Sequence, residues 1–316
     1  MSTIAPSDRG DGHPAPEPDR YGPAGRSPWL DIDWPAHQRW VTVEGTPINT
    51  IELGEGPPIV FVHGLGGCWQ NWLEQLPVLA RTHRVLAMDL PGFGYSPMPR
   101  EEISIPGYAR VLDGLLAALG IDAAVVVGNS MGGFIGAELA IAFPQRVERL
   151  VLVSAAGLST HNDPLPVRTM PVLVYLERFL TGASALLAAK SETVMRRRRL
   201  REATLSAVVA HPARLPAALA AEQLRGAGKP GFLTALQAVI SFDVRDRLPE
   251  IACPTLIVWG DRDRLITVRD ADRFEELIAD SRKVVFEDTG HMAMLERPDA
   301  FNALLERFVA EQPLSG

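Results

Sequence analysis

The chain contains only two cysteines among its 316 residues, Cys68 and Cys253. Two cysteines this far apart do not make a disulfide framework, and such usage is typical of a reducing compartment. No apolar run approaches the roughly 18 residues that a membrane-spanning helix needs, and the N-terminus has no apolar core of a signal peptide. We therefore expect a cytoplasmic chain without a transmembrane segment.

An excess of positive charge is also missing. The formal net charge is -7 at pH 7, which argues against nucleic acid as a partner. Apolar residues make up 47% of the chain and charged residues 22%, which is ordinary for a soluble globular protein. The length allows one large α/β domain or two smaller ones, with a sizeable core in either case.

The first part of the chain has little that could enter a core. Residues 1–28 are rich in Pro, Gly, Asp and Arg. Such a segment cannot bury enough apolar surface to offset the entropy lost on ordering. We predict that residues 1–28 form a disordered N-terminal tail.

Short apolar runs alternate with helical patterns through most of the remaining chain. The runs typical of buried strands are 58–63, 84–89, 123–127, 150–154, 254–259 and 283–286. Helical spacing is found in 73–81, 105–119, 133–143, 268–278 and 299–310. This alternation predicts an α/β fold with a mostly parallel, doubly wound sheet. Two short strands within 40–53 predict an antiparallel first edge.

One long segment interrupts the alternation. Residues 158–245 contain no convincing strand and are rich in Ala, Leu, Arg and Pro, which predicts several helices. We expect a helical cap, or lid, inserted into a core formed by 29–157 and 246–316. Such a cap would lie over the carboxyl ends of the strands, where open parallel sheets place their ligand crevices.

The cap is basic. It has 12 Lys and Arg against 6 Asp and Glu, and it includes the run Arg196-Arg197-Arg198-Arg199. One interpretation is a solvated helix face beside an acidic core domain. The other is a lid with weak contact to lipid or anionic interfaces.

The pentapeptide Gly128-Asn129-Ser130-Met131-Gly132 lies between a predicted strand and a predicted helix. A G-x-S-x-G at such a junction is typical of a sharp turn that lifts the serine hydroxyl clear of the sheet edge. Serine needs a base to take its proton and a third group to orient that base. We therefore predict that Ser130 is a nucleophile.

The predicted base is His291, which follows the last predicted strand. His63 ends an earlier strand beside Gly64, and we expect it to brace that loop. The acid should follow the strand that ends at Trp259, where Asp261 and Asp263 are both candidates.

These motifs resemble those of the α/β-hydrolase family, over nearly everything from about residue 40 to the C-terminus. In that family a G-x-x-D turn carries the acid, and this resemblance selects Asp263. A second family position follows the strand ending at Ser154, but the turn there has no carboxylate. The implied catalytic residues are Ser130, Asp263 and His291, in the order expected for this fold.

An oxyanion needs two preorganised donors. One is predicted to be the backbone N–H of Met131, at the start of a helix, where unpaired N–H groups favour negative charge. The other is implied by the resemblance of His63-Gly64-Leu65-Gly66-Gly67 to the family's H-G-x-G-G loop, which points to the N–H of Leu65. Asn129 is a candidate substrate-binding residue, with bracing of the turn as the alternative.

The nucleophile separates this chain from family members that carry aspartate in the turn, such as epoxide hydrolases and haloalkane dehalogenases.

The leading prediction is an esterase or lipase that hydrolyses a small-molecule ester without metal or organic cofactor. A carbon–carbon bond hydrolase of diketone ring-cleavage products is the alternative, because 128–133 is similar to those enzymes. They carry a proline in the oxyanion loop and an aromatic after the histidine, where this chain has Gly66-Gly67 and Met292. A ligand-sensing receptor of the same fold is a third hypothesis. The acyl preference and oligomeric state stay open.

Overall fold

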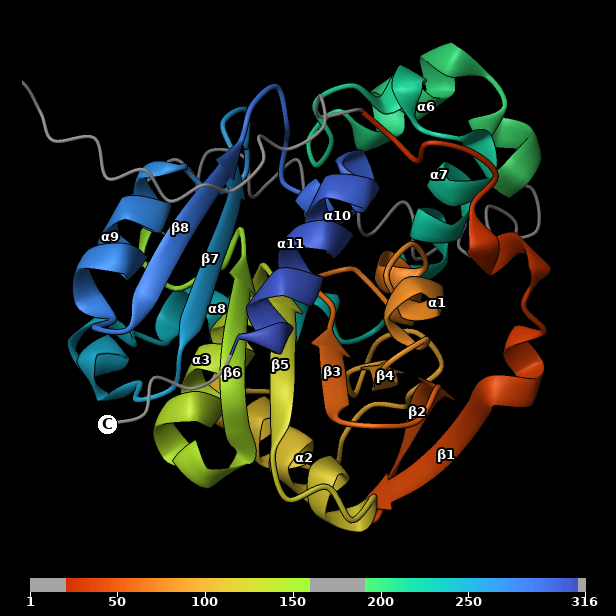
Figure 1. The fold of residues 1–316 in the computed structure, drawn as a ribbon. Helices are drawn as coiled ribbons and strands as arrows, with labels where there is room; N and C mark the ends of the chain where they lie inside the picture. The colour runs from red at the N-terminus through yellow and green to blue at the C-terminus, as the bar shows by residue number, and fades with distance from the viewer. Residues whose placement is uncertain (1–20, 160–190, 312–316) are drawn as a thin grey trace, which may run out of the picture.

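The computed structural model describes residues 21–159 and 191–311, and its centre is an eight-stranded sheet (Figure 1). The strand order is β1-β2-β4-β3-β5-β6-β7-β8. The strands are β1 (Gln38–Val43), β2 (Thr46–Leu53), β3 (Pro58–Val62), β4 (Arg84–Met88), β5 (Ala124–Asn129), β6 (Val147–Val153), β7 (Thr255–Gly260) and β8 (Ser281–Phe286). The pairs β1–β2 and β2–β4 are antiparallel and the other five are parallel. The predicted fold class and the antiparallel first edge are confirmed.

The central strands are apolar because both faces of the sheet are covered by helices. Along β3, Ile59 and Phe61 enter one core while Val60 and Val62 enter the other. One face is covered by α2 (Ile105–Ala118), α3 (Met131–Ala142), α8 (Phe232–Ser241) and α9 (Arg269–Leu277), the other by α1 (Leu76–Leu79), α10 (Ala293–Glu296) and α11 (Pro298–Ala310). The sheet is therefore doubly wound.

Helix α2 shows how local sequence sets the bounds of an element. Its N-cap Ser104 accepts a hydrogen bond from the Gly107 N–H at 3.1 Å, which pairs one of the free donors of the first turn. Gly120 follows the helix with a φ of 65°, a conformation that glycine adopts without a steric penalty. The helix expected over 73–81 is shorter, since α1 covers Leu76–Leu79 and a 3-10 turn, η3 (Trp69–Trp72), precedes it.

The cap segment between β6 and β7 is helical and contains no strand within its described part, 191–245. It contributes α6 (Arg198–Leu205), α7 (Ala217–Gln223) and α8. The remaining 3-10 turns of the described residues are η1 (Pro28–Asp31), η2 (Trp34–His37), η4 (Pro144–Arg146), η5 (Pro212–Arg214), η6 (Leu224–Gly226) and η7 (Arg245–Glu250). The proposed cap residues 160–190 lie outside the described residues, and the boundaries 158 and 245 stay predictions.

The N-terminal segment departs from the predicted tail. Residues 1–20 lie outside the described part of the chain, but within 21–28 the residues Tyr21, Gly22 and Ser27 are buried against the rest of the chain instead of forming a tail. Tyr21 and Ser27 are buried, and the Ser27 hydroxyl donates to a carboxylate oxygen of Glu74 at 2.7 Å. The composition of 1–28 does not indicate this packing, because the packing depends on partners far along the chain.

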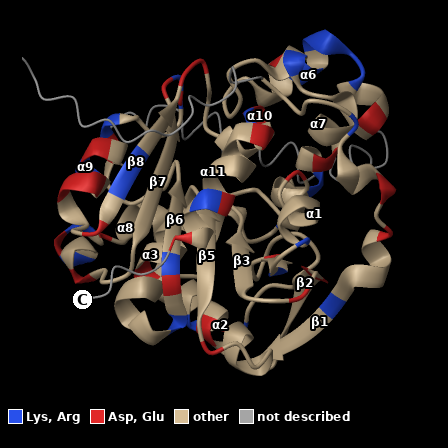
Figure 2. Cartoon of the chain, viewed as in Figure 1, with Lys and Arg blue, Asp and Glu red and all other residues tan. Residues whose placement is uncertain are grey.

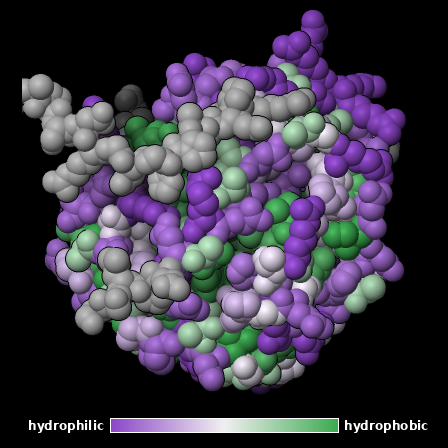
Figure 3. Space-filling view, in the orientation of Figure 1, coloured by the Kyte–Doolittle hydropathy of each residue, from purple (hydrophilic) through white to green (hydrophobic). Residues whose placement is uncertain are grey.

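The basic run lies at the edge of the cap, where Figure 2 shows blue ribbon at α6 and Figure 3 shows hydrophilic residues in the same place. Arg196 pairs with Glu192 at 2.7 Å and Arg198 with Glu202 at 3.0 Å, all on exposed side chains. These local pairs fit a solvated helix face. Contact with lipid or anionic interfaces stays a prediction.

No helix within the described ranges combines the length and apolar character needed to cross a membrane. The cytoplasmic location stays a prediction.

Candidate active site

Ser130 lies at the junction of β5 and α3 in a strained conformation. Its φ is 56° and its ψ is -118°, an unfavourable region for a residue with a Cβ. The backbone around it is fixed by hydrogen bonds, from Ser130 N–H to Val153 O at 2.9 Å and from Ala156 N–H to Ser130 O at 3.1 Å. The turn is thus the strained strand-to-helix elbow that the sequence motif predicts.

The glycines of the motif are required by close backbone approach. A Cβ on Gly132 would lie 2.2 Å from the carbonyl oxygen of Val62, and a Cβ on Gly128 would lie 2.3 Å from that of Gly132. Both distances are far below van der Waals contact. Glycine at these two positions therefore lets α3 begin directly beneath Ser130, against the end of β3.

Asp263 and His291 are brought together from the ends of neighbouring strands β7 and β8. His291 Nδ1 lies 2.7 Å from Asp263 Oδ2, and both side chains are buried. The other carboxylate oxygen, Oδ1, accepts the N–H groups of Leu265 at 2.8 Å and Ile266 at 3.0 Å. Because Oδ2 is an acceptor, the Nδ1 of His291 carries the proton and Nε2 is left as a base.

The competing carboxylate, Asp261, has a different partner. Its Oδ1 accepts the backbone N–H of Thr289 at 3.1 Å. Asp261 thus ties the end of β7 to the loop that carries His291 by a hydrogen bond from backbone. The family resemblance selects Asp263 over Asp261, and in the structure Asp263 is the one that contacts the imidazole.

The loop after β3 lies against the elbow. A Cβ on Gly64 would lie 3.0 Å from the Cβ of Ser130, so the chain passes the nucleophile closely. Among the backbone–backbone hydrogen bonds that the described residues form in turns, loops and caps, none has the N–H of Leu65 or Met131 as donor. The roles of these two N–H groups as oxyanion donors stay predictions.

His63 braces this loop. Its Nδ1 lies 2.8 Å from Gly64 O, and its Nε2 accepts the Leu90 N–H at 3.0 Å. The side chain is fully buried, and burial lowers the pKa of the His63 imidazole, so that it is neutral in the folded chain. Both ring nitrogens are thereby occupied in holding the loop.

Asn129 makes the contacts of a bracing residue. Its side-chain amide is buried and donates to Val153 O at 3.1 Å and to His291 O at 3.3 Å. These bonds join the elbow directly to the histidine loop. The predicted role of Asn129 in substrate binding stays a prediction, and neither contact supports it.

The sequence analysis did not single out Glu296. This glutamate is completely buried at the end of α10 and accepts the Gly290 N–H at 3.0 Å, directly beside His291. A Glu five residues after a predicted catalytic histidine was the only local signal, because its other partners, Tyr21 and Ala210, are remote in sequence.

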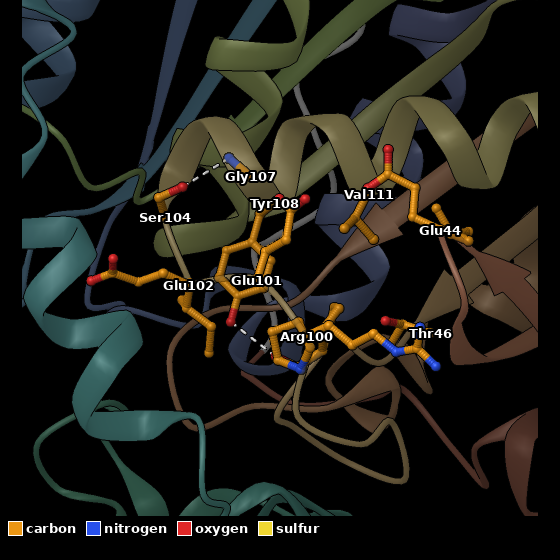
Figure 4. A pocket seen from close by; sticks show the side chains of 13 residues that line it. Glu44, Thr46, Arg100, Glu101, Glu102, Ser104, Gly107, Tyr108 and Val111 are labelled. Carbon is orange, nitrogen blue, oxygen red and sulfur yellow. Dashed lines mark hydrogen bonds between the residues drawn. The ribbon is translucent and has the colours of Figure 1, made fainter.

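A separate surface cleft lies between the β1–β2 turn and the start of α2 (Figure 4). Its lining includes Glu44, Thr46, Arg100 and Tyr108, and the Tyr108 hydroxyl donates to Pro91 O at 3.0 Å. None of the predicted catalytic residues lines it. The cleft is therefore not the candidate active site. Within the described residues, no cluster of His, Cys, Asp or Glu could hold a metal ion.

The family model described as the alpha/beta hydrolase fold matches residues 57–298. The match covers most of the chain, and it includes the elbow, the acid and the histidine. The chain belongs to the α/β-hydrolase fold family.

Curated proteins similar to this chain include hydrolases of 2-hydroxy-6-oxo-hexadienoates. The chain is 31% identical over 283 residues to the 2-hydroxy-6-oxo-6-(2'-aminophenyl)hexa-2,4-dienoic acid hydrolase of Metapseudomonas resinovorans, covering 85% of this chain and 89% of the relative. It is also 31% identical over 276 residues to the 2-hydroxy-6-oxo-6-phenylhexa-2,4-dienoate hydrolase of Comamonas testosteroni, covering 84% and 92%.

The solved structure of a phospholipase also resembles this chain. A membrane phospholipase A, described as a bacterial virulence factor, superimposes with a TM-score of 0.68 at 28% identity, over 86% of this chain and 85% of that chain. Dienoate hydrolases and a phospholipase therefore both resemble this chain, which is a hydrolase of this fold.

Proposed function

We propose that the chain is a serine hydrolase that cleaves carboxylic esters through an acyl-enzyme intermediate. The observation that carries the serine-hydrolase part of the proposal is the Asp263–His291 pair, at 2.7 Å, beside the strained Ser130 elbow. Asp263 orients the imidazole so that Nε2 can take the serine proton. No metal or organic cofactor enters this mechanism.

In the proposed reaction, Ser130 Oγ attacks the ester carbonyl while His291 Nε2 accepts its proton. The N–H groups of Leu65 and Met131 stabilise the resulting oxyanion, and each such donor is worth about 3–4 kcal/mol in related chemistry. His291 then gives the proton to the leaving alcohol. Water, activated by the same imidazole, releases the acid and restores Ser130.

A carbon–carbon hydrolase is the second candidate, and the curated relatives favour it. Their names give a 2-hydroxy-6-oxo-hexadienoate as the compound that is hydrolysed. The same nucleophile and base could cleave such a diketone, with the proton delivered to carbon instead of to an alcohol oxygen. Gly66-Gly67 and Met292, where those enzymes are expected to carry proline and an aromatic residue, favour the ester.

The two functions are separated by turnover of two substrate classes. One assay follows p-nitrophenyl esters from acetate to palmitate, and the other follows the bleaching of 2-hydroxy-6-oxo-6-phenylhexa-2,4-dienoate. We expect kcat/KM to be higher for an ester and to fall on the order of 10⁴-fold or more in Ser130→Ala. Preferential, Ser130-dependent turnover of the dienoate would replace the ester proposal by its alternative. If Ser130→Ala keeps both activities, the ester proposal and its alternative are both wrong.

A further inference from the structure

The carboxylate of Glu296 holds the backbone on both sides of His291. Each of its oxygens accepts the Gly290 N–H at 3.0 Å, and Oε1 also accepts the Met292 N–H at 3.3 Å. A Cβ on Gly290 would lie 2.9 Å from Oε1 and 2.7 Å from Ala210 N, so the fit leaves no free space. The position of the imidazole therefore depends on where this carboxylate lies.

Two segments remote in sequence hold the carboxylate in turn. Glu296 Oε2 accepts the Ala210 N–H of the cap at 2.9 Å and the Tyr21 hydroxyl of the N-terminal segment at 2.8 Å. The same hydroxyl accepts the His211 N–H at 2.9 Å. The N-terminal segment, the cap and the histidine loop thus meet at one carboxylate, in the region of α10 and α6 in Figure 1.

The charge of this carboxylate is sensitive to the loss of any donor. Burial raises the pKa of Glu296, and the hydrogen bonds from Gly290, Ala210 and Tyr21 act in the opposite direction. Cationic groups fix the Tyr21 ring, with the guanidinium carbons of Arg214 and Arg297 at 4.5 and 4.9 Å from its centroid. Tyr21 is therefore held in place where the three segments meet at Glu296.

We propose that Glu296 is the positioning residue of the His291 loop and that Tyr21 keeps Glu296 in place. Tyr21, from the N-terminal segment, is then part of the machinery that aligns the active site. The assignment of His291 as base rests on the proposed function, whereas the alignment of its loop does not. Misplacement of a catalytic group by about 1 Å can cost on the order of 10²-fold in rate.

The chain offers a matched set of variants. Tyr21→Phe removes only the hydroxyl and keeps the ring under the two guanidinium groups. Glu296→Gln places an amide N–H₂ against groups that are themselves donors. Ser27→Ala is the control, because its hydroxyl donates at 2.7 Å to a different buried glutamate, Glu74, whose further side-chain donor is Trp29.

Three measurements read the position of the imidazole. They are kcat and KM on the best p-nitrophenyl ester, the rate at which a fluorophosphonate labels Ser130, and the ¹⁵N NMR titration of the His291 imidazole, assigned with His291→Gln. We expect about a tenfold lower kcat and labelling rate in Tyr21→Phe and about 10²-fold in Glu296→Gln, with KM within about twofold and a shifted imidazole titration. Ser27→Ala should lower Tm while leaving all three unchanged.

Tyr21→Phe that matches Ser27→Ala in kcat, labelling and titration would overturn the proposal. If Glu296→Gln does not fold, the comparison of Tyr21→Phe with Ser27→Ala decides alone. If the wild-type chain neither turns over esters nor is labelled, the proposed function fails. The NMR titration still tests the positioning role in that case, because it needs no substrate.

Discussion

Asp261 and Asp263 lie two residues apart at the end of β7 and make different contacts. Asp263 holds the His291 imidazole at 2.7 Å, while Asp261 accepts a backbone N–H from Thr289. At the residue scale, the assignment of the acid therefore depends on which way each side chain turns. Exchanging each carboxylate for an amide tests it.

Asp263→Asn should lower kcat on the best substrate on the order of 10³–10⁴-fold. Because Oδ1 accepts the N–H groups of Leu265 and Ile266, the amide N–H₂ of the variant must face His291. It would donate to Nδ1 and leave the proton on Nε2, where the base is needed. Steady-state kinetics at constant pH gives the measurement.

Asp261→Asn is the control for this change. Its amide oxygen can still accept the Thr289 N–H, so we expect kcat to change by less than about threefold. Equal losses in the two variants would contradict the assignment of Asp263 as the acid.

At the scale of elements, Gly132 and Gly136 of helix α3 differ in what surrounds them. A Cβ on Gly132 would meet the Val62 carbonyl oxygen at 2.2 Å, which is rigid backbone of β3. A Cβ on Gly136 would meet the Leu150 and Val126 side chains at 3.1 and 3.3 Å, which can shift slightly. Position in the helix therefore decides the effect of the same substitution.

We expect Gly132→Ala to lower the free energy of unfolding by about 3 kcal/mol, because the start of α3 must move away from β3. Gly136→Ala should stay within about 1 kcal/mol of wild type, since the gain in helix propensity offsets the tighter packing. Urea unfolding of both variants gives the comparison. A smaller loss for Gly132→Ala than for Gly136→Ala would refute this account of the motif.

The extents of several elements follow from local sequence. The capping Ser104 and the positive φ of Gly120 bound α2 as the pattern indicates, and the apolar runs of β3 and β5 form the central strands. The helix predicted over 73–81 was too long, because only Leu76–Leu79 form α1 and a 3-10 turn precedes it. Local patterns identify elements well because their hydrogen bonds close within a few residues.

At the scale of the whole molecule, stability should depend on pH through His63. Burial is the largest cause of its lowered pKa, with Asp89 and the bond to Gly64 acting oppositely. In the folded chain the imidazole is neutral, whereas an unfolded histidine binds a proton near pH 6.5. Stability is thus fully present above that pH and falls as pH drops toward the lowered folded pKa, by up to about 1.4 kcal/mol per pH unit.

Urea unfolding between about pH 7.5 and 5.5 should show this loss, and His63→Gln should have a shallower slope despite lower stability at neutral pH. His83→Gln is the control. Its imidazole is half-buried and its pKa is also lowered by burial, so it should flatten the slope less. An unchanged slope in His63→Gln would show that this histidine is not the titrating group.

The sequence by itself determined the order of strands and helices, the elbow around Ser130, and the histidine that follows the last strand. These features are local, because pleat, helical period and turn residues act between near neighbours. Only the tertiary structure decided that Asp263 contacts the imidazole, that Asn129 joins two loops, and that Tyr21 and Ser27 are buried. The bond between Tyr21 and Glu296 joins residues 275 positions apart, and no local pattern records a contact that chain folding alone creates.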